Sequence, residues 1–378
     1  MTSFVDIVER LFDPVAYGDI INLSSTPRAQ SNWQFVIGPN NAGPQYELTM
    51  AYQRSLTYHI DDSATCVFSV HGDDPVLQYI TELVTDLWVY RNGLLLFRGR
   101  IGSSGDELDG EADTYELTFN VFDYREWLMR QILPPSHKWS WRSITQAQII
   151  RDLFTYTINN QSGIHPTFTI DTTQMPTSKV NFDITPGTSI KETIGVMAGF
   201  GWQVFPNSTT GITLKAMSPF YYKYNTGFIL QYGSTVSKIS RSLDTGGYAN
   251  STVYTGDMNL APLQNDASGI ASMPQGRLGQ TLSNPSIKDK THLSQAASSA
   301  SARSLAVSPT WSCTLAPNVW NDSTDCWIGD ICQFIVKKGR FNINDKYRIT
   351  DMTININDDS DTGADSVDLT LVKPASLP

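Results

Sequence analysis

The chain has 378 residues and a mass of 42.0 kDa, and its formal net charge is −10 at pH 7. Charged residues make up only 17% of the sequence, while hydrophobic residues make up 40% and aromatic residues 11%. An acidic chain without clustered basic residues binds the phosphate backbone poorly, so the composition argues against a nucleic-acid-binding protein and favours a subunit with large buried or interfacial faces.

The first part of the chain, up to about residue 135, consists of short strand-like segments joined by turns. β-branched and aromatic residues dominate these segments, and Pro, Gly, Asn and Asp separate them. The expected strands include residues 33–39, 46–51, 55–60 and 65–70. Because strands do not alternate with helices here, the pattern predicts an antiparallel barrel or sandwich.

The sequence of residues 87–101 is typical of a β-hairpin. Asn92-Gly93 lies between two apolar runs, and this pair is preferred in tight turns because both central residues need a positive φ. A further strand is expected over residues 114–125. Residues 105–113 between these strands are mostly Gly and acidic residues, so we expect a solvated loop there.

The pattern changes after residue 135. Ser143 and Gln146 have the spacing of a capping box and precede apolar residues at helical spacing. A second helix is expected to begin at Ser189, with Glu192 three residues later. A hairpin over residues 202–215 follows. Residues 136–220 therefore read as a small α/β insert.

Strand-like segments return after residue 220. They cover residues 228–230, 236–240, 251–254, 311–315, 331–336, 347–356 and 367–372. Between Pro262 and Pro285 the sequence is rich in Gly, Ser, Gln and Asn, which predicts a long loop, and residues 292–307 have helical character. The predicted fold is mainly β, with two antiparallel β-barrel domains and smaller inserted domains.

The order of these motifs resembles that of siphophage minor tail proteins of the baseplate-hub type. The motifs in the first part of the chain are Val89-Tyr90-Arg91-Asn92-Gly93, Phe97-Arg98-Gly99, Asp123-Tyr124-Arg125 and Leu133-Pro134-Pro135. The motifs near the end are Trp327-Ile328-Gly329-Asp330, Arg348-Ile349-Thr350 and Asp368-Leu369-Thr370-Leu371. The resemblance extends from about residue 46 to residue 373.

The resemblance implies a division of the chain into hub domains and insertions. Residues 1–135 are expected to form the first β-barrel hub domain, and residues 136–220 the α/β insert domain. Residues 221–260 and 306–378 are expected to form the second barrel, interrupted by a loop and helix insertion at 261–305.

The function implied by the resemblance is structural and not enzymatic. Three copies are expected to form the tail-tip hub, a pseudo-sixfold ring that continues the tail tube and lets DNA pass to the host. The expected partners are the distal tail protein, the end of the tape-measure protein and other tip proteins. The expected location is the distal end of the phage tail in the virion, after assembly in the host cytoplasm.

We do not expect this chain to insert stably into a membrane. Residues 1–10 contain Asp6 and Glu9 and lack an apolar segment, so we expect no signal peptide. No apolar run reaches the length of a membrane span.

Two acidic patterns raise the question of a metal site. His and Asp occur together in residues 59–62 and 71–74, and imidazole with carboxylate is a common ligand set. Residues 358–363 are rich in carboxylates but lack the terminal Glu of a calcium loop. Since Asp and Gly at strand ends are ordinary turn residues, we expect surface turns, with no metal and no cofactor.

No set of residues points to catalysis. Glu107, Glu111 and Asp113 lie in the expected acidic loop, where solvation keeps carboxylates ionised and makes them poor general acids. The rival hypothesis is a tail-tip protein that binds or degrades cell-wall carbohydrate, which would use exposed aromatic residues. Trp139 and Trp141 suit either a recognition patch or an anchor for the insert.

The four cysteines are Cys66, Cys313, Cys326 and Cys332. Their spacing contains no C-x-x-C pair, so a zinc site or a disulfide framework is disfavoured. We expect reduced thiols that pack as small apolar side chains.

Overall fold

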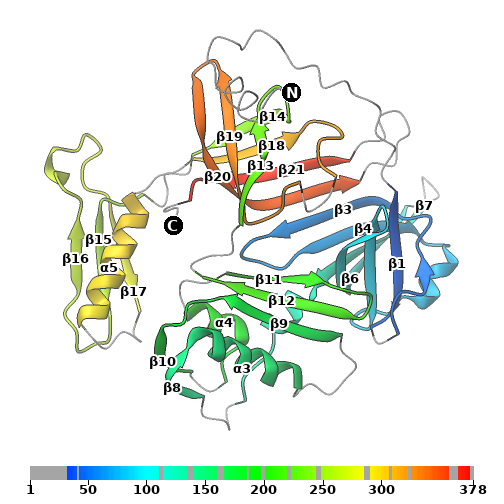
Figure 1. Cartoon of the computed structure of the whole chain (residues 1–378), viewed down its shortest axis with the longest axis horizontal. Helices are drawn as coiled ribbons and strands as arrows, with labels where there is room; N and C mark the ends of the chain where they lie inside the picture. The colour runs from blue at the N-terminus through cyan, green and yellow to red at the C-terminus, as the bar shows by residue number, and fades with distance from the viewer. Residues whose placement is uncertain are drawn as a thin grey trace, which may run out of the picture.

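The computed structural model describes residues 32–40, 42–109, 114–134, 139–159, 166–184, 187–196, 201–218, 223–243, 248–284, 290–305, 309–321, 325–356 and 365–374. These residues form a 13-stranded sheet, a mixed α/β insert packed beside it and a small α/β module at the side of the molecule (Figure 1). The prediction of a mainly β fold with an α/β insert is confirmed.

One half of the large sheet comes from the first part of the chain. Its strands are β1 (Trp33–Pro39), β2 (Tyr46–Glu47), β3 (Tyr52–His59), β4 (Thr65–His71), β5 (Thr85–Arg91), β6 (Leu94–Asp109) and β7 (Thr114–Asp123). They lie in the order β3-β4-β7-β6-β5-β1-β2, and every neighbouring pair is antiparallel. A 3-10 helix, η1 (Pro75–Tyr79), lies in the connection between β4 and β5.

The other half comes from the last part of the chain. Its strands are β13 (Lys223–Gln231), β14 (Val236–Ser242), β18 (Thr310–Leu315), β19 (Asp330–Lys338), β20 (Phe341–Ile356) and β21 (Ser366–Val372). The order β14-β18-β21-β20-β19 repeats the order β3-β4-β7-β6-β5 of the first half, with the same connectivity along the chain. β13 adds to β19 as a parallel strand.

The two halves are parts of one sheet, so two separate barrels are not confirmed. β20 is 16 residues long, and its first part pairs with β19 over Phe341–Arg348. Its second part pairs with β3, from Asp351 opposite His59 to Ile356 opposite Arg54. A strand of this length extends past its hairpin partner, and its free backbone groups then accept a second partner.

The hairpin turn between β5 and β6 is confirmed, because Asn92 and Gly93 have φ values of 51° and 79°. The expected loop over residues 105–113 is wrong in its first part. β6 continues to Asp109 and pairs with β7 as far as Thr114, while residues 110–113 lie outside the described residues. Acidic residues do not end a strand whose backbone pairs with a neighbouring strand along one edge.

A single hydrophobic core joins both halves of the large sheet. It contains Phe35, Phe68 and Leu87 from the first half and Trp311, Phe334 and Ile354 from the second. All of these side chains are almost fully buried. Burial of this continuous apolar face is the main force that holds the halves together, since the hydrophobic gain scales with the apolar area removed from water.

The insert has its own core. Its elements are α2 (Tyr124–Met129), β8 (Ser140–Thr145), α3 (Gln146–Asn159), β9 (Thr167–Gln174), β10 (Lys179–Asp183), α4 (Ile190–Val196), β11 (Gly201–Pro206) and β12 (Gly211–Met217). β11, β12 and β9 form one small sheet, β8 and β10 another, and α3 supplies Ile149, Ile150, Leu153 and Phe154 to the core.

The two predicted helix starts have different outcomes. The capping box at α4 is confirmed, because Ser189 and Glu192 exchange side-chain-to-backbone hydrogen bonds. Ser143 does not cap α3, because the helix begins only at Gln146, three residues further on. Thr145 takes that role and accepts a hydrogen bond from the Gln148 amide at 3.3 Å.

The module contains β15 (Ser251–Thr255), β16 (Leu263–Asp266), η2 (Ile270–Ser272), β17 (Gly279–Ser283) and α5 (Lys290–Leu305). β15 lies between β16 and β17, outside the large sheet, so its expected place in the second barrel is wrong. The expected loop between Pro262 and Pro285 contains β16 and β17. Hydrogen-bonded Asn250, Ser251 and Gln280 stabilise these polar strands, which lack the apolar alternation that sequence patterns detect.

Candidate functional site

The joint between the halves of the large sheet is the place where distant parts of the chain meet. β3 and β20 pair along six positions, where Thr57 and Thr353 place their hydroxyl groups 3.3 Å apart. At the end of the joint the Nδ1 atom of His59 lies 2.7 Å from the Oδ1 atom of Asp351. Both of these side chains are more than one-third exposed, so solvent screens the pair and its contribution to stability is small.

A buried ion pair lies beside this joint. Arg91 at the end of β5 donates from Nη2 to Oδ2 of Asp365 at 3.1 Å, and the two side chains are 7% and 5% exposed. The indole N–H of Trp33 also donates to Asp365, at 3.0 Å. Residues more than 270 positions apart along the chain are thereby held by charge-assisted hydrogen bonds.

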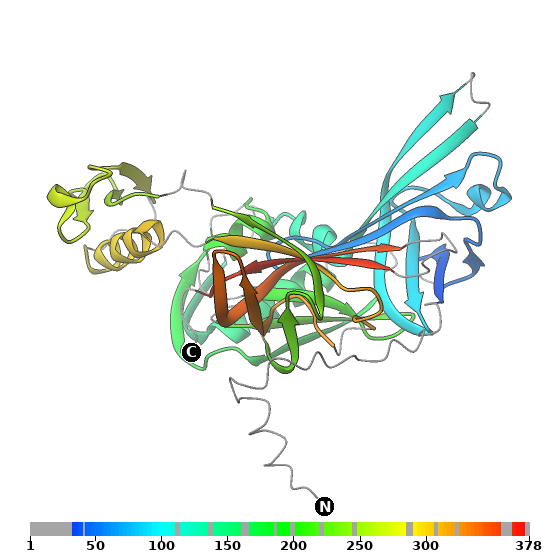
Figure 2. The same cartoon turned by 90° about the horizontal axis from the view of Figure 1, so that it is seen from above.

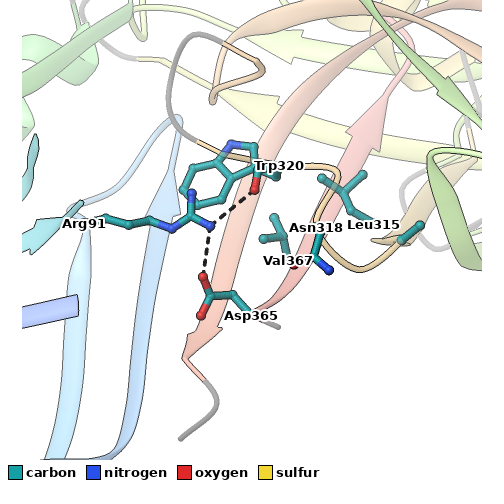
Figure 3. A pocket seen from close by; sticks show the side chains of 7 residues that line it. Arg91, Leu315, Asn318, Trp320, Asp365 and Val367 are labelled. Atoms are coloured by element: carbon teal, nitrogen blue, oxygen red, sulfur yellow. Dashed lines mark hydrogen bonds and ion pairs between the residues drawn. The ribbon is translucent and has the colours of Figure 1, made fainter. Parts of the chain in front are cut away.

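Trp320 completes the cluster around Arg91. The guanidinium lies over the Trp320 ring at 4.5 Å from its centre, and Nη2 also donates to the Trp320 carbonyl at 3.3 Å (Figure 3). The pocket at this place is lined by Arg91, Leu315, Ala316, Asn318, Trp320, Asp365 and Val367. It has room for about one water molecule, so its chemistry is that of a packed joint and not of a substrate site.

A second charged cluster lies inside the first half. Asp86 is fully buried and accepts hydrogen bonds from Arg98 at 3.0 Å, from Arg100 at 3.3 Å and from the Tyr124 hydroxyl at 2.5 Å. Burial raises the pKa of the Asp86 carboxyl, while the Tyr124 hydrogen bond and the two guanidiniums act in the opposite direction. The cluster ties β5 and β6 to α2, the first element of the insert.

The insert is fixed to the sheet by Arg125. Its Nη1 atom donates to the carbonyls of Ile60 and Asp62 at 3.0 and 2.9 Å, and Gln203 of β11 donates to the Ile60 carbonyl at 2.7 Å. Asp123 caps α2 and is fully enclosed by protein. Burial raises the pKa of its carboxyl to about 7, against the Arg125 guanidinium and the backbone N–H donors, which lower it.

The residues considered for metal binding are dispersed. His59 contacts Asp351, while His71 lies 3.8 Å from Asp73 on an exposed turn, and Asp74 accepts a hydrogen bond from the Val76 amide at the start of η1. In the described ranges, no group of three or more His, Cys, Asp or Glu residues is placed to hold a metal ion. Residues 358–363 lie outside these ranges.

The candidate residues for catalysis and for carbohydrate recognition do not come together in one site among the described residues. Glu107 is exposed on β6, and Glu111 and Asp113 lie outside the described residues. Trp139 and Trp141 are 6% and 7% exposed and belong to the core of the insert, so they anchor it and form no surface patch. All nine tryptophans are buried or half-buried.

The four cysteines are free and buried, as the sequence predicts. Burial raises the pKa of each thiol, so the reactive thiolate is disfavoured at neutral pH. Among the described residues no helix is both long and apolar enough to cross a membrane.

The sequence contains little that identifies the Arg91–Asp365 pair in advance. Arg91 belongs to the motif that predicts the hairpin, and an arginine directly before the Asn-Gly turn of an otherwise apolar strand is the one available signal. Asp365 follows a run of aspartates that reads as a solvated loop. Only the pairing of β3 with β20 brings these residues together.

Comparisons with known proteins find the fold among phage tail proteins. The chain is similar to the 43 kDa tail protein of prophage MuSo2 from Shewanella oneidensis, with a TM-score of 0.63 and 14% identity, over 90% of this chain and 98% of the other. A tail protein from Neisseria meningitidis gives a TM-score of 0.64 and 12% identity, over 90% and 97%. A chain of the Francisella PdpA–VgrG complex is similar with a TM-score of 0.54 and 9% identity, and the match covers 92% of this chain and 59% of that chain.

No protein-family model matches the sequence, and no curated protein matches it. The likeness therefore concerns the fold. The resemblance to tail proteins that the motifs indicate is confirmed at this level, because the prophage proteins match over nearly their whole length.

Proposed function

We propose that this chain is a structural minor tail protein that forms the hub at the tip of a long phage tail. The observation that carries the proposal is the extent of the fold likeness, which takes in 97% and 98% of two prophage tail proteins. A likeness of this extent favours a shared role in the tail more than a shared domain inserted into unrelated proteins.

The sheet supports a role in a tube wall. Its halves repeat one strand order and join edge to edge, which is a way to build a closed wall from repeated units. We propose that three copies form the hub ring, so that six sheet halves surround the lumen. The hub then closes or extends the tail tube and lets DNA pass to the host.

The domain division follows the sheet. We propose hub domains built on residues 1–123 and on residues 221–250 with 306–378, and an α/β insert at 124–220, because α2 supplies Leu128 and Met129 to the core of the insert. Residues 251–260 move from the second hub domain to the module, because β15 pairs only with β16 and β17 among the described strands.

The proposed partners are other structural proteins at the distal end of the tail. They are the distal tail protein, the end of the tape-measure protein and further tip proteins, assembled in the host cytoplasm. The Francisella complex, in which a similar chain occurs, contains PdpA and VgrG, which supports association with other tip components. A net charge of −10 suits a wall past which DNA slides, because few cations are available to hold phosphate.

We propose no catalytic role. The alternative, a protein that binds or degrades cell-wall carbohydrate, needs a cluster of exposed aromatic side chains. Among the described residues the tryptophans are buried or half-buried, and Tyr79, which is 44% exposed, stacks against Tyr46. No observation in the described part of the chain favours that alternative over the hub.

The copy number tests the proposal. Native mass spectrometry of the purified chain should give a particle of three times 42.0 kDa, and quantification of purified tails should give three copies per tail. Six or twelve copies per tail would assign the chain to the tube or to the distal-tail ring. A monomer in the purified sample together with no copies in tails would exclude a hub.

A further inference from the structure

The two halves of the large sheet agree in detail as well as in strand order. In each half, one residue with a positive φ donates its backbone N–H to an isoleucine carbonyl on the long strand at 2.8 Å. Leu83, with φ of 65°, donates to Ile101, and Gly329, with φ of 84°, donates to Ile349. Positive φ is uncommon for a non-glycine residue such as Leu83, so its match with Gly329 in conformation and hydrogen bond supports the equivalence of the two positions.

The long strands β6 and β20 are also equivalent in length and register. Both have 16 residues. Each has a register shift directly after the isoleucine, between Ile101 and Ser103 in β6 and between Ile349 and Asp351 in β20. Ser103 is therefore the counterpart of Asp351.

The outer edge of β20 is occupied within the chain, whereas that of β6 is open. Residues 351–356 of β20 pair with β3 on the side that β19 leaves free. The counterpart in β6 is residues 103–108. Beyond Ile101, no described strand pairs with β6 on the side of β5. Figure 2 shows this hairpin, in cyan, extending away from the body of the molecule.

The counterpart of β3 is open as well. β3 pairs with β4 on one side and with β20 on the other. Its counterpart β14 pairs with β18 and has no partner on its other side among the described strands. The described part of the chain thus has one closed joint, between β20 and β3, and two unpaired strand edges, on β14 and on the outer part of β6, that correspond to the two sides of a second joint of the same kind.

We propose that the outer part of β6, residues 102–109, pairs with β14 of the next copy of this chain, in the antiparallel register that β20 and β3 have within the chain. This inference rests on the proposed ring and specifies its contact. In a ring of three copies, each joint within a chain would be followed by an equivalent joint between chains. An open edge strand is a ready template for this kind of pairing.

The register follows from the closed joint. Thr57 and Ser242 are equivalent, because each pairs with the first residue of the following strand, Thr65 or Thr310. Ile354 lies opposite Leu56 in the closed joint. The corresponding residues in the joint between copies are Asp106 and Arg241.

The other opposed pairs follow by counting along the strands. Glu107 comes opposite Ser240, Leu108 opposite Ile239 and, one position beyond the template, Asp109 opposite Lys238. Two acidic residues thus meet two basic residues, and one apolar residue meets another. Opposite charges and apolar pairs are the cross-strand combinations that stabilise a sheet.

The charge distribution supports this partner. Residues 1–137, which contain β6, have 19 acidic residues, eight arginines and no lysine. β14 contains Lys238 and Arg241, both exposed, and no acidic residue. Within the hairpin, Glu107 lies directly opposite Glu116, a like-charge pair that destabilises a sheet unless a cation lies nearby. A basic strand from a neighbouring copy supplies such a cation.

Cross-linking tests the register. The variant with Glu107→Cys and Ser240→Cys should form disulfides between copies on mild oxidation and give covalent products up to three times 42.0 kDa. The native thiols are buried and should not compete. The matched control, Glu107→Cys with Ser242→Cys, moves one thiol two positions along the strand, and its yield should be about tenfold lower.

Charge exchange provides a second test. Arg241→Asp should raise the dissociation constant of the ring about tenfold or more, and Asp106→Arg added to the same chain should restore it. Lys191→Asp, on the exposed face of α4, makes the same charge change and should have no effect.

The outcomes separate this inference from the proposed hub. If the chain forms a trimer but neither the cross-link nor the charge exchange behaves as described, the pairing of β6 with β14 is wrong and the hub proposal stands. If the wild-type chain forms no ring at all, both are wrong.

Discussion

The joint between β3 and β20 and the two open edges, on β14 and on the outer part of β6, have equivalent strands but different surroundings. The closed joint lies beside the buried Arg91–Asp365 pair and over the shared hydrophobic core. The open edges carry exposed Lys238, Arg241 and Glu107. The same strand pairing can therefore be stabilised in two ways. Within the chain, burial of apolar and ionic side chains stabilises it, and between copies, as we propose, opposite charges on the two strands stabilise it.

The largest effect is expected at the closed joint. Arg91→Leu removes the cationic partner of a buried carboxylate and should lower the free energy of unfolding by about 3–5 kcal/mol, as urea denaturation would show. The double variant Arg91→Leu with Asp365→Leu should recover most of this loss, because neither residue of the ion pair is then left buried without the other. A loss below about 1 kcal/mol for Arg91→Leu would show that the pair does not hold the halves together.

The ends of β7 and β21 extend the comparison to pH. Asp123, the last residue of β7, is buried, whereas its counterpart Lys373, directly after β21, makes an exposed ion pair with Asp345. Because the pKa of Asp123 is raised from 3.8 to about 7, the folded state holds a proton that the unfolded state has lost between about pH 4 and pH 7. Its contribution to stability therefore falls as pH rises through that window.

Asp123→Asn should remove this dependence while it keeps the helix cap. From about pH 4 to pH 7 the wild type should lose about 1 kcal/mol of unfolding free energy per pH unit relative to the variant. Above about pH 7 the difference between the two proteins should stay constant. A difference that does not change with pH would show that Asp123 is ionised throughout.

The two hairpin turns allow a smaller, matched comparison. Gly93 and Gly339 have φ values of 79° and 58°, and no atom lies within 4 Å of the place that a side-chain methyl group would take at either residue. Alanine at either position should therefore cost about 1–2 kcal/mol through backbone strain alone. Gly105 also has open space but no positive φ, so Gly105→Ala should change stability by less than about 0.5 kcal/mol. Equal effects at all three positions would contradict the turn assignment.

The smallest effect is expected at the exposed end of the closed joint. His59 and Asp351 are each 37% exposed, so His59→Gln should lower the free energy of unfolding by less than about 1 kcal/mol. Thermal unfolding of this variant beside Arg91→Leu would measure the contrast. A larger loss for His59→Gln than for Arg91→Leu would show that the exposed His59–Asp351 pair, and not the buried ion pair, stabilises the joint most.

The sequence predicts well those features that depend on local patterns. Asn92-Gly93 predicts a turn because its conformational preference is intrinsic, and Ser189 with Glu192 predicts a helix start for the same reason. The extension of β6 to Asp109 was hidden, because its pairing with β7 outweighs the loop-like composition. β16 and β17 escaped prediction because hydrogen bonds, and not apolar alternation, hold them in place.

The features that position the candidate site depend on contacts between distant residues. Arg91 and Asp365 are separated by 274 positions, and nothing local to either residue indicates the other. The repeat of strand order is also invisible in the sequence, since equivalent strands share pairing partners and not residue types. Tertiary pairing had to be known before either feature could be recognised.

The most direct test of the central claim is a cryo-EM map of purified tails that resolves the strand paths at the tip. The account predicts a ring of three copies in which β14 of each copy runs antiparallel to residues 102–109 of its neighbour, with Asp106 opposite Arg241. A tip with another number of copies, or a ring in which β14 contacts a different protein or solvent, would contradict it.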